Sequence, residues 1–336
     1  MKVQLIGLGN VSRSLIELLI KEKECLRSSG CSFEIVSVSD SRGTALDENG
    51  LNLKEILKYK KEDWAGFIKY KEGYSALKAI KDIKSDLVVE LTQSTLSGEP
   101  GLSHIKSSLS LGKHVVTSNK GPLVVSFKEL MELAEKNKVR LLYEATVAAH
   151  VPIFCLLDSC FIADEILSVE GIFNATTNFI IGEIEAGRSF KEALNQAIKA
   201  GWAEANYSDD VDGIDAARKV VILANTIYKT DFKLEDVRVE GIRNVEPLVR
   251  NANKLNKKIK LLCEIKKIDD KISLNVSPKM IPHDDPLSTV NQGDMGVKFH
   301  FKNSQNIFVS AQFKSPIQTA YAVLNDMIKV ALCNNC

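Results

Sequence analysis

Residues 201–219 gather acidic side chains and a lysine whose types and spacing could support acid/base chemistry. Asp215 and Lys219 are four residues apart, which places them one turn apart on the same face of a helix. Asp212 is predicted to cap that helix, with Asp215 at the third position of a variant capping box. An apolar run at 220–224 follows, so we expect the face carrying Asp215 and Lys219 to be buried. Because a buried lysine needs acidic partners or loses its proton, Lys219 is a candidate acid/base group.

The same residues also fit a purely structural explanation. A capped helix with one surface ion pair between Asp215 and Lys219, contributing about 0.3–0.5 kcal/mol, accounts for them without any chemistry. The residue types alone leave both interpretations open.

Two further polar residues follow predicted strands. Lys120 comes after the strand predicted at 114–117, and Thr92 comes after the one predicted at 87–91. Ligands of open α/β sheets bind outside the carboxyl ends of the strands, so both side chains are candidates to contact a ligand. The alternatives are an exposed lysine at the start of a helix and a threonine in a turn.

The N-terminus carries a glycine-rich turn between a short apolar strand and an amphipathic helix. Gly7 permits the turn, and Gly9 would let a pyrophosphate approach the backbone at the helix N-terminus. Asn10 and Val11, which begin the helix, belong to the same predicted cofactor site. Ser12 replaces the third glycine of the dinucleotide-binding pattern and is small enough for close helix–strand packing. The alternative is a tight turn that binds no ligand.

Strands and helices alternate through the first part of the chain. Amphipathic segments such as 53–59 and 102–111 separate predicted strands at 3–6, 33–38, 87–91, 114–117 and 141–143. This alternation predicts an α/β fold with a Rossmann-type, doubly wound parallel sheet in a dinucleotide-binding domain over 1–142.

A change of character after residue 143 predicts a second, α+β domain over 143–315 for catalysis and dimerisation. Its predicted strands lie at 168–173, 260–266, 271–276 and 305–312. An amphipathic helix at 316–332 is expected to join the first domain, and the charge run at 254–260 is expected to be a solvated face.

Composition limits the possible classes of protein. A length of 336 residues predicts two domains at roughly 150 residues each, and 45% hydrophobic with 26% charged residues is typical of soluble globular proteins. With 44 Lys and Arg against 43 Asp and Glu, the net charge of +1 argues against nucleic-acid binding. The chain lacks the run of about 18–20 apolar residues that would cross a membrane. Seven scattered cysteines and an N-terminus without room for a signal peptide predict a cytoplasmic location.

Together these segments resemble the homoserine dehydrogenase family, in a short form without a regulatory domain. The most specific part is similar to the family's G-[YF]-x-E-x-D-P-x-x-D-[VL]-x-G-x-D-x-A-x-K signature, and the matching positions include Gly201, Glu204, Asp210, Gly213, Asp215 and Lys219. Three other segments resemble the family's GIxNGTTN, T-x-N-K and monovalent-cation-binding segments: 171–178, 117–120 and 144–152.

The resemblance implies the interconversion of L-homoserine and L-aspartate 4-semialdehyde with NAD(P), a step toward threonine and methionine. Acidic side chains suit the ammonium group of homoserine, and the implied substrate-binding residues are Glu204, Asp210, Asp215 and Thr177. The hydroxyl must lose a proton as the hydride leaves, and the implied catalytic residues are Lys219, Lys120 and Asp215. The implied cofactor-binding residues are Gly7, Gly9, Asn10, Val11, Asp40, Arg42, Thr92, Lys120 and Gly201.

The choice of cofactor is open. Asp40 would accept hydrogen bonds from a ribose hydroxyl and favour NAD, whereas Arg42 would pair with a 2′-phosphate and favour NADP. We expect both to bind.

The resemblance also implies a sodium site and a homodimer formed through the second domain. Glu144 and the backbone carbonyls of Val147, Ala149 and Val151 would hold the ion with hard oxygen ligands. The alternative is a buried Glu144 hydrogen-bonded to its own loop.

Several positions depart from the family pattern. His150 and Ala175 stand where the family has glycine, and Asn206-Tyr207 replaces Asp-Pro. Residues 312–316 lack the glycine-rich turn before the last helix, and bulkier residues there are expected to reshape the nicotinamide pocket.

Two other functions are alternatives for this sequence. A semialdehyde dehydrogenase would need an activated thiol beside a histidine, but Cys155 and Cys160 lie in the apolar run 153–161 and are predicted to be core residues. A non-catalytic dinucleotide-binding sensor is suggested by the missing glycines before Pro316.

Overall fold

A computed structural model describes residues 1–59, 64, 67–203 and 207–333. The chain divides into two compact units. The first comprises Met1–His150 and the C-terminal residues from Ser315, and the second comprises Val151–Lys314.

The first unit is built on a seven-stranded sheet with the order β4-β3-β2-β1-β5-β6-β7. Its parallel strands are β1 (Lys2–Ile6), β2 (Glu34–Ser39), β5 (Leu87–Glu90), β6 (His114–Thr117) and β7 (Leu141–Leu142). At the β2 edge, β3 (Gly43–Leu46) and β4 (Tyr70–Glu72) extend the sheet in antiparallel fashion. The doubly wound sheet expected from the sequence is therefore present, with an antiparallel extension that the pattern did not predict.

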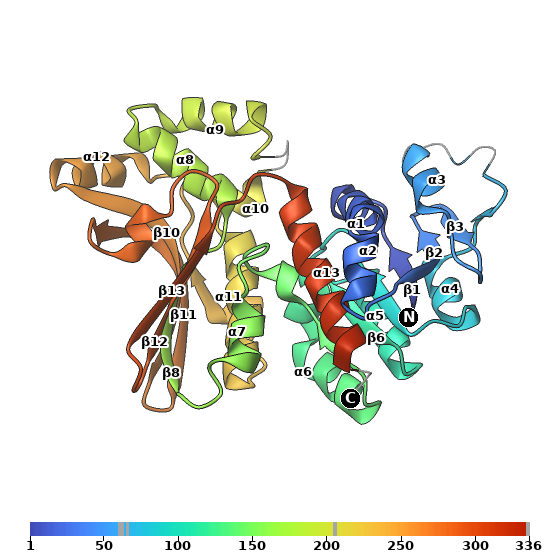
Figure 1. The fold of residues 1–336 in the computed structure, drawn as a ribbon. Helices are drawn as coiled ribbons and strands as arrows, with labels where there is room; N and C mark the ends of the chain where they lie inside the picture. Colours follow the sequence, from blue (N-terminus) through green and yellow to red (C-terminus); the bar gives the residue numbers. More distant parts are fainter. Residues whose placement is uncertain (60–63, 65–66, 204–206, 334–336) are drawn as a thin grey trace. The chain divides into compact units, whose positions relative to one another are not determined.

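Helices connect these strands: α1 (Asn10–Lys21), α2 (Lys23–Ser28), α3 (Leu53–Lys58), α4 (Ala76–Asp82), α5 (Gly101–Ser110) and α6 (Lys120–Lys136). After β7 the chain forms the short 3-10 helix η1 (Glu144–Thr146). The last helix, α13 (Pro316–Cys333), returns to the first unit and lies beside α1 (Figure 1). Its apolar face joins the core cluster of β1, β2 and α1 through Ala320, Val323, Leu324, Met327 and Val330.

The second unit is built on a six-stranded sheet with the order β13-β12-β8-β10-β11-β9. Its strands are β8 (Ile166–Ile172), β9 (Val237–Val239), β10 (Lys257–Ile268), β11 (Lys271–Pro282), β12 (Met295–Phe301) and β13 (Asn306–Ala311). All pairs are antiparallel except β11 with β9. The predicted second α+β domain is confirmed, although β9 and β12 were not anticipated.

The helices of the second unit are α7 (Ile153–Ser159), α8 (Ala175–Glu185), α9 (Phe190–Lys199), α10 (Ser208–Val211), α11 (Ile214–Tyr228) and α12 (Glu246–Lys254), with two 3-10 turns, η2 (Leu234–Asp236) and η3 (Pro286–Thr289). Helix α11 packs against β10 and β11. As its sequence predicted, residues 220–224 of α11 are fully buried.

The predicted cap at Asp212 is wrong. Helix α11 begins after Gly213, whose φ of 80° lies in the left-handed region, and no side chain caps it. The Asp212 carboxylate instead pairs with the guanidinium of Arg243, with one N–O distance of 2.8 Å. This pairing lowers the pKa of Asp212.

The charge run at 254–260 is not wholly a solvated face. Lys260 is 1% exposed, because β10 begins at Lys257 and lies between β8 and β11 in the sheet. The lysine-rich run thus places Lys260 in the interior of the second unit, whereas Lys257 remains exposed.

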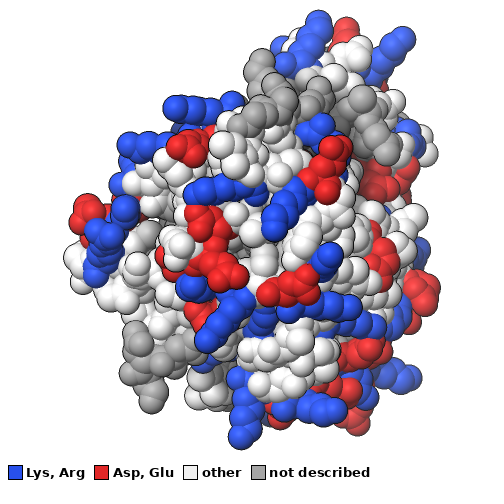
Figure 2. Space-filling view, turned by 90° about the vertical axis from the view of Figure 1, so that its right-hand side faces the viewer, with Lys and Arg blue, Asp and Glu red and all other residues white. Residues whose placement is uncertain are grey.

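The described surface carries both signs of charge. On the face shown in Figure 2, Lys and Arg are interspersed with Asp and Glu. No helix of the described residues is long and apolar enough to span a membrane.

We predict that Met327→Ala lowers the free energy of unfolding by about 2–5 kcal/mol, since this side chain on α13 is completely buried in the core of the first unit. Denaturant titration would measure the loss. Asn325→Ala, on the exposed side of the same helix, is the matched control and should change stability little. Equal stability of the two variants would show that α13 is not part of the core.

Candidate active site

Lys219 and Asp215 form the ion pair that their spacing predicted. The Lys219 Nζ lies 2.7 Å from the Asp215 Oδ2, and the two side chains are only 12% and 15% exposed. The same ammonium donates to the carbonyl oxygen of Phe173, at the end of β8, at 2.6 Å. Lys219 is therefore held by a carboxylate and a carbonyl in a largely enclosed place and does not point into solvent.

Asn174 joins this pair to a second carboxylate. Its Nδ2 donates to the Asp210 Oδ1 at 2.7 Å and to the Asp215 Oδ2 at 2.9 Å. Its Oδ1 accepts from the backbone N–H of Thr177 at 2.8 Å, which makes Asn174 the N-cap of α8. One amide thus links the start of α8 to Asp210 of α10 and to Asp215 in the first turn of α11.

Asn174 is not among the site residues predicted from the sequence. In the segment 171–178 only Thr177 has a predicted role, and it is buried beside the cap and donates its hydroxyl to the Asn174 carbonyl at 3.1 Å. The available signal was an asparagine directly before a helix, in a segment already matched to a family motif.

The segment that leads toward Glu204 is held by aromatic packing. Thr176 Oγ1 donates to the Trp202 carbonyl at 2.6 Å. The indole of Trp202 packs against the rings of Phe179 and Phe313, with centroids 5.9 and 6.1 Å away. Phe313 belongs to the stretch that lacks the family's glycines, and its ring packs against Trp202.

Two other predicted residues lie near this segment. Gly201 follows α9 with a φ of 76°, a left-handed conformation that favours glycine. Glu204, predicted to bind substrate, lies outside the described residues.

The glycine turn of the first unit fits a dinucleotide. Gly7 has a φ of 90°, and a Cβ added there would lie 2.7 Å from the Leu91 carbonyl oxygen. A Cβ added at Gly9 would meet no atom within 4 Å, so open space faces the backbone there. Helix α1, which starts with Asn10 and Val11, has no side-chain cap, so its first N–H groups can bind an anion.

Thr92 and Lys120 follow the carboxyl ends of adjacent strands, β5 and β6, as expected. Thr92 is tied down on both sides: its hydroxyl bonds the Glu90 carboxylate, and Asn119 Nδ2 donates to it at 3.1 Å. Lys120 is half-buried and begins α6, whose N-cap is Asn119.

Glu90 is a completely buried carboxylate beneath these residues. Thr117 Oγ1 donates to its Oε2 at 3.3 Å, and the His104 Nδ1 lies 3.5 Å from its Oε1. This carboxylate connects the ends of β5 and β6, so it fixes the two turns that carry Thr92 and Lys120.

Asp40 follows β2, but its carboxylate is already engaged. It accepts hydrogen bonds from the Trp64 indole at 2.8 Å, from the Tyr70 hydroxyl at 2.9 Å and from the backbone N–H groups of Arg42 and Gly43. Burial would raise the pKa of Asp40, but these hydrogen bonds outweigh it and the pKa is lowered. The Arg42 side chain is 44% exposed.

The segment predicted to bind sodium crosses the division between the units, since Glu144, Val147 and Ala149 lie in the first and Val151 begins the second. Glu144 is buried, and its backbone N–H donates to Asp326 of α13 at 2.8 Å. No group of three or more His, Cys, Asp and Glu among the described residues could hold a metal ion, so an ion here would need backbone carbonyls.

The prediction that Cys155 and Cys160 are core residues is wrong. Both are exposed: α7 buries Ile153 and Phe154 and exposes Cys155, and Cys160 is the exposed residue that follows the helix. The apolar composition of residues 153–161 therefore predicted more burial than the structure shows.

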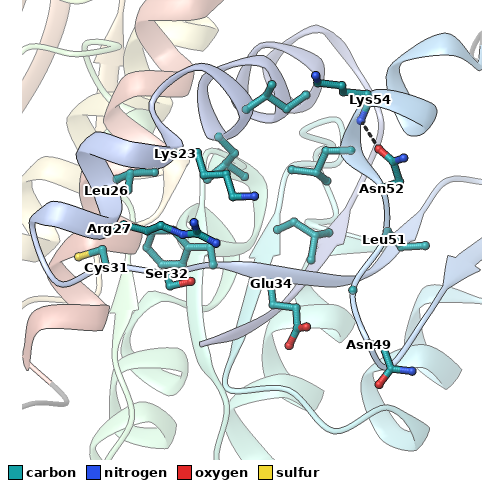
Figure 3. A pocket seen from close by; sticks show the side chains of 16 residues that line it. Lys23, Leu26, Arg27, Cys31, Ser32, Glu34, Asn49, Leu51, Asn52 and Lys54 are labelled. Carbon is teal, nitrogen blue, oxygen red and sulfur yellow. Dashed lines mark hydrogen bonds between the residues drawn. The ribbon is translucent and has the colours of Figure 1, made fainter.

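A hollow of about 560 Å³ in the first unit lies away from these residues (Figure 3). It is lined at the amino end of β2 by Glu34 and by the cations Lys23, Arg27 and Lys54. The glycine turn and Asp40 lie at the opposite, carboxyl ends of β1 and β2, where ligands of such sheets bind.

Two family models match the chain over most of its length. The model described as the NAD binding domain of homoserine dehydrogenase matches residues 7–144, and the one described as homoserine dehydrogenase matches residues 152–328. The chain belongs to the homoserine dehydrogenase family. It is an oxidoreductase that uses NAD(P), and the resemblance inferred from the sequence motifs is confirmed.

Individual members of the family agree with this assignment. The chain is 37% identical to the homoserine dehydrogenase of Methanocaldococcus jannaschii, with 98% of each chain covered. It is 32% identical to the NAD(+)-dependent homoserine dehydrogenase of Pseudomonas canavaninivorans, covering 98% of this chain and 96% of that one. The structure of a hyperthermophilic archaeal homoserine dehydrogenase in complex with NADPH matches with a TM-score of 0.86 at 26% identity, covering 99% and 98%.

Lys219→Ala should lower turnover by at least about 100-fold, because a positioned acid/base group is removed. The affinity for NAD(P) should change little, since the glycine turn is in the other unit. Steady-state kinetics and cofactor titration by fluorescence would measure the two effects. The control is Lys199→Ala, at the exposed end of α9. Retention of more than about a tenth of the activity would contradict the role of Lys219.

Proposed function

We propose that this chain catalyses the reversible oxidation of L-homoserine to L-aspartate 4-semialdehyde with NAD or NADP. The observation that carries the proposal is the arrangement of Asp210, Asp215 and Lys219 around Asn174, in a chain of the homoserine dehydrogenase family. The arrangement supplies both an acidic pair and an enclosed amine, which the two ends of homoserine require.

The acidic side chains are proposed to bind the ammonium group of the substrate. Asp210 and Asp215 share the amide of Asn174, so their carboxylates are oriented before the substrate arrives. Charge-assisted hydrogen bonds from an ammonium to such groups are stronger than neutral ones. Glu204 completes the proposed set, with Thr177 fixing the start of α8.

Lys219 is proposed to exchange the proton of the substrate hydroxyl. Its Nζ is oriented by the Phe173 carbonyl and the Asp215 carboxylate, so the amine can accept the proton during oxidation and return it during reduction. Asp215 supports this role by orienting the Lys219 Nζ through their ion pair. Lys120 is proposed to polarise the same oxygen. The bound nicotinamide supplies the hydride chemistry.

The first unit is proposed to bind the cofactor at the carboxyl ends of β1 and β5. Open space at Gly9 and the uncapped start of α1, at Asn10 and Val11, fit a pyrophosphate. Gly7 permits the turn, and Thr92 and Lys120 at the neighbouring strand ends are proposed to contact the nicotinamide end. Gly201 is the proposed contact from the second unit.

Both NAD and NADP are proposed to bind. Arg42 is the residue proposed to bind a 2′-phosphate, because 44% of its side chain is exposed and its guanidinium lies 4.0 Å from the Asp40 carboxylate at the end of β2. Asp40 is a weaker candidate for a ribose contact than its sequence position suggested, since four donors already bind its carboxylate.

Three further properties are proposed from the family resemblance. A sodium ion would be held by Glu144 with the carbonyls of Val147, Ala149 and Val151. The chain would act as a homodimer formed through the second unit, and it would act in the cytoplasm. The buried Glu144 and the left-handed turn at Ala149, with a φ of 51°, support a tight loop at the proposed ion site.

The activity is tested by following absorbance at 340 nm with homoserine and with each cofactor in turn. We expect reduction of NAD and of NADP that requires homoserine and is lost in Lys219→Ala. Cofactor binding without homoserine-dependent reduction between pH 7 and about pH 10 would instead support the non-catalytic sensor, which neither the site nor the family assignment favours.

Arg42→Ala should raise KM for NADP about tenfold or more and leave KM for NAD nearly unchanged, because only NADP carries the phosphate that a guanidinium pairs with. Initial rates with both cofactors would show the difference. Arg27→Ala, an exposed arginine on α2, is the matched control. Equal effects of Arg42→Ala on the two cofactors would exclude a 2′-phosphate contact.

A further inference from the structure

Lys260 is a buried cation that the reaction described above does not use. Its residue is 1% exposed, although it lies in the lysine-rich start of β10. Its Nζ donates to the Asn178 Oδ1 on α8 at 3.0 Å and to the Val290 carbonyl at 2.5 Å. Burying a lysine costs free energy unless its charge is compensated. An apolar side chain at this position would avoid that cost, so packing of the core alone does not explain Lys260.

The groups around this ammonium are mostly neutral. Within the described part of the chain, no carboxylate lies within ion-pair distance of the Lys260 Nζ. The charged groups that act on it from the packed elements are Glu185 of α8, Asp294, and Lys258 on its own strand. Its cross-strand partner Lys279 is exposed and lies 3.5 Å from Glu264. The ammonium is therefore held by an amide and a carbonyl.

Both acceptors connect α8 to the segment 290–294, which links η3 to β12. Asn178 Nδ2 donates to the carbonyls of Val290 and Asp294 at 3.1 and 3.2 Å. Lys260 binds the other end of the same amide and also the Val290 carbonyl. The Lys260 ammonium, the Asn178 amide and the Val290 carbonyl thus form a small buried hydrogen-bond network, which fixes the segment 290–294 against α8.

The fixed segment supports Trp202. Gly293 lies so close to the indole that an added Cβ would be 2.3 Å from ring carbons of Trp202. The backbone carbonyl of Trp202 accepts the hydroxyl of Thr176, and its indole packs against Phe179 of α8. The indole therefore lies between α8 and the segment 290–294, two positions before the signature residue Glu204 in the sequence.

We propose that Lys260 is a positioning residue for the substrate side of the active site: its buried ammonium holds the segment 290–294 to Asn178, and the segment holds Trp202. The inference rests on the proposed function for its kinetic part and on the fold alone for the position of Trp202. Lys260 acts at a distance from Lys219 and the acids, through packing.

The charge of Lys260 also makes the network sensitive to alkaline pH. Burial lowers the pKa of Lys260 to about 8. Below that pH the ammonium makes charge-assisted hydrogen bonds to both acceptors, and above it the neutral amine binds them more weakly. The hold on the segment 290–294 should therefore loosen as the pH rises through about 8.

The experiment compares Lys260→Met, which keeps an unbranched side chain one atom shorter and removes its charge, with wild type. The indole N–H resonances of the two tryptophans are recorded in ¹⁵N-labelled protein from about pH 6.5 to about 9.5, and Trp64→Phe assigns them. We expect the Trp202 resonance to shift with a midpoint near pH 8 in wild type and to show no such transition in Lys260→Met. The kcat/KM for homoserine should fall about tenfold in the variant, with KM for NAD(P) unchanged.

Lys258→Met is the matched control, since Lys258 lies two residues away on β10 and pairs with Glu185 at 3.1 Å. It should keep the kcat/KM of wild type and a pH transition, with the midpoint moved to higher pH, because Lys258 is one of the charges that lower the pKa of Lys260. A wild-type Trp202 resonance that does not move between these pH values would overturn the proposal, and so would a transition near pH 8 that is retained in Lys260→Met. The wild-type titration decides even if the variant fails to fold. Absence of homoserine oxidation by wild type would count against the proposed function and leave the resonance test valid.

Discussion

The amide of Asn174, shared between two carboxylates, is the interaction on which the site depends. Asp210 and Asp215 carry like charges, and two carboxylates this close to one amide nitrogen would repel each other without a donor between them. The amide supplies two donors from one nitrogen while its oxygen caps α8. The same side chain therefore caps α8 and orients both acids, and Lys219 completes the set by pairing with Asp215.

Single carboxylates likewise fix the turns at the carboxyl ends of the strands in the first unit. A single buried carboxylate, Glu90, bonds the turn after β5 and the strand β6, and a single aspartate, Asp40, organises the turn after β2. Buried carboxylates that accept several hydrogen bonds are costly to move, so the ends of the parallel strands form a rigid edge for a ligand. This explains why Asp40, at the position of a ribose-binding acid, has a structural role.

Departures from the family pattern are absorbed by packing in the second unit. The stretch before α13 has Phe313 in place of small residues, and its ring packs on Trp202. Trp202 also contacts Gly293 and Phe179. Phe313, in place of a glycine, therefore adds a ring to the aromatic cluster around Trp202. The proposed network of Lys260 supports the same cluster through the segment 290–294.

The sequence by itself determined the neighbours that are close along the chain. Helical periodicity placed Asp215 beside Lys219, strand–turn–helix order placed Gly7 and Gly9 at the start of α1, and motif spacing identified the family. Only the tertiary structure brought Asn174 to two acids some forty residues away, buried Lys260 and exposed Cys155. These outcomes depend on which strands and helices lie on each side of a residue, and that is decided by packing between distant segments, which local residue types do not encode.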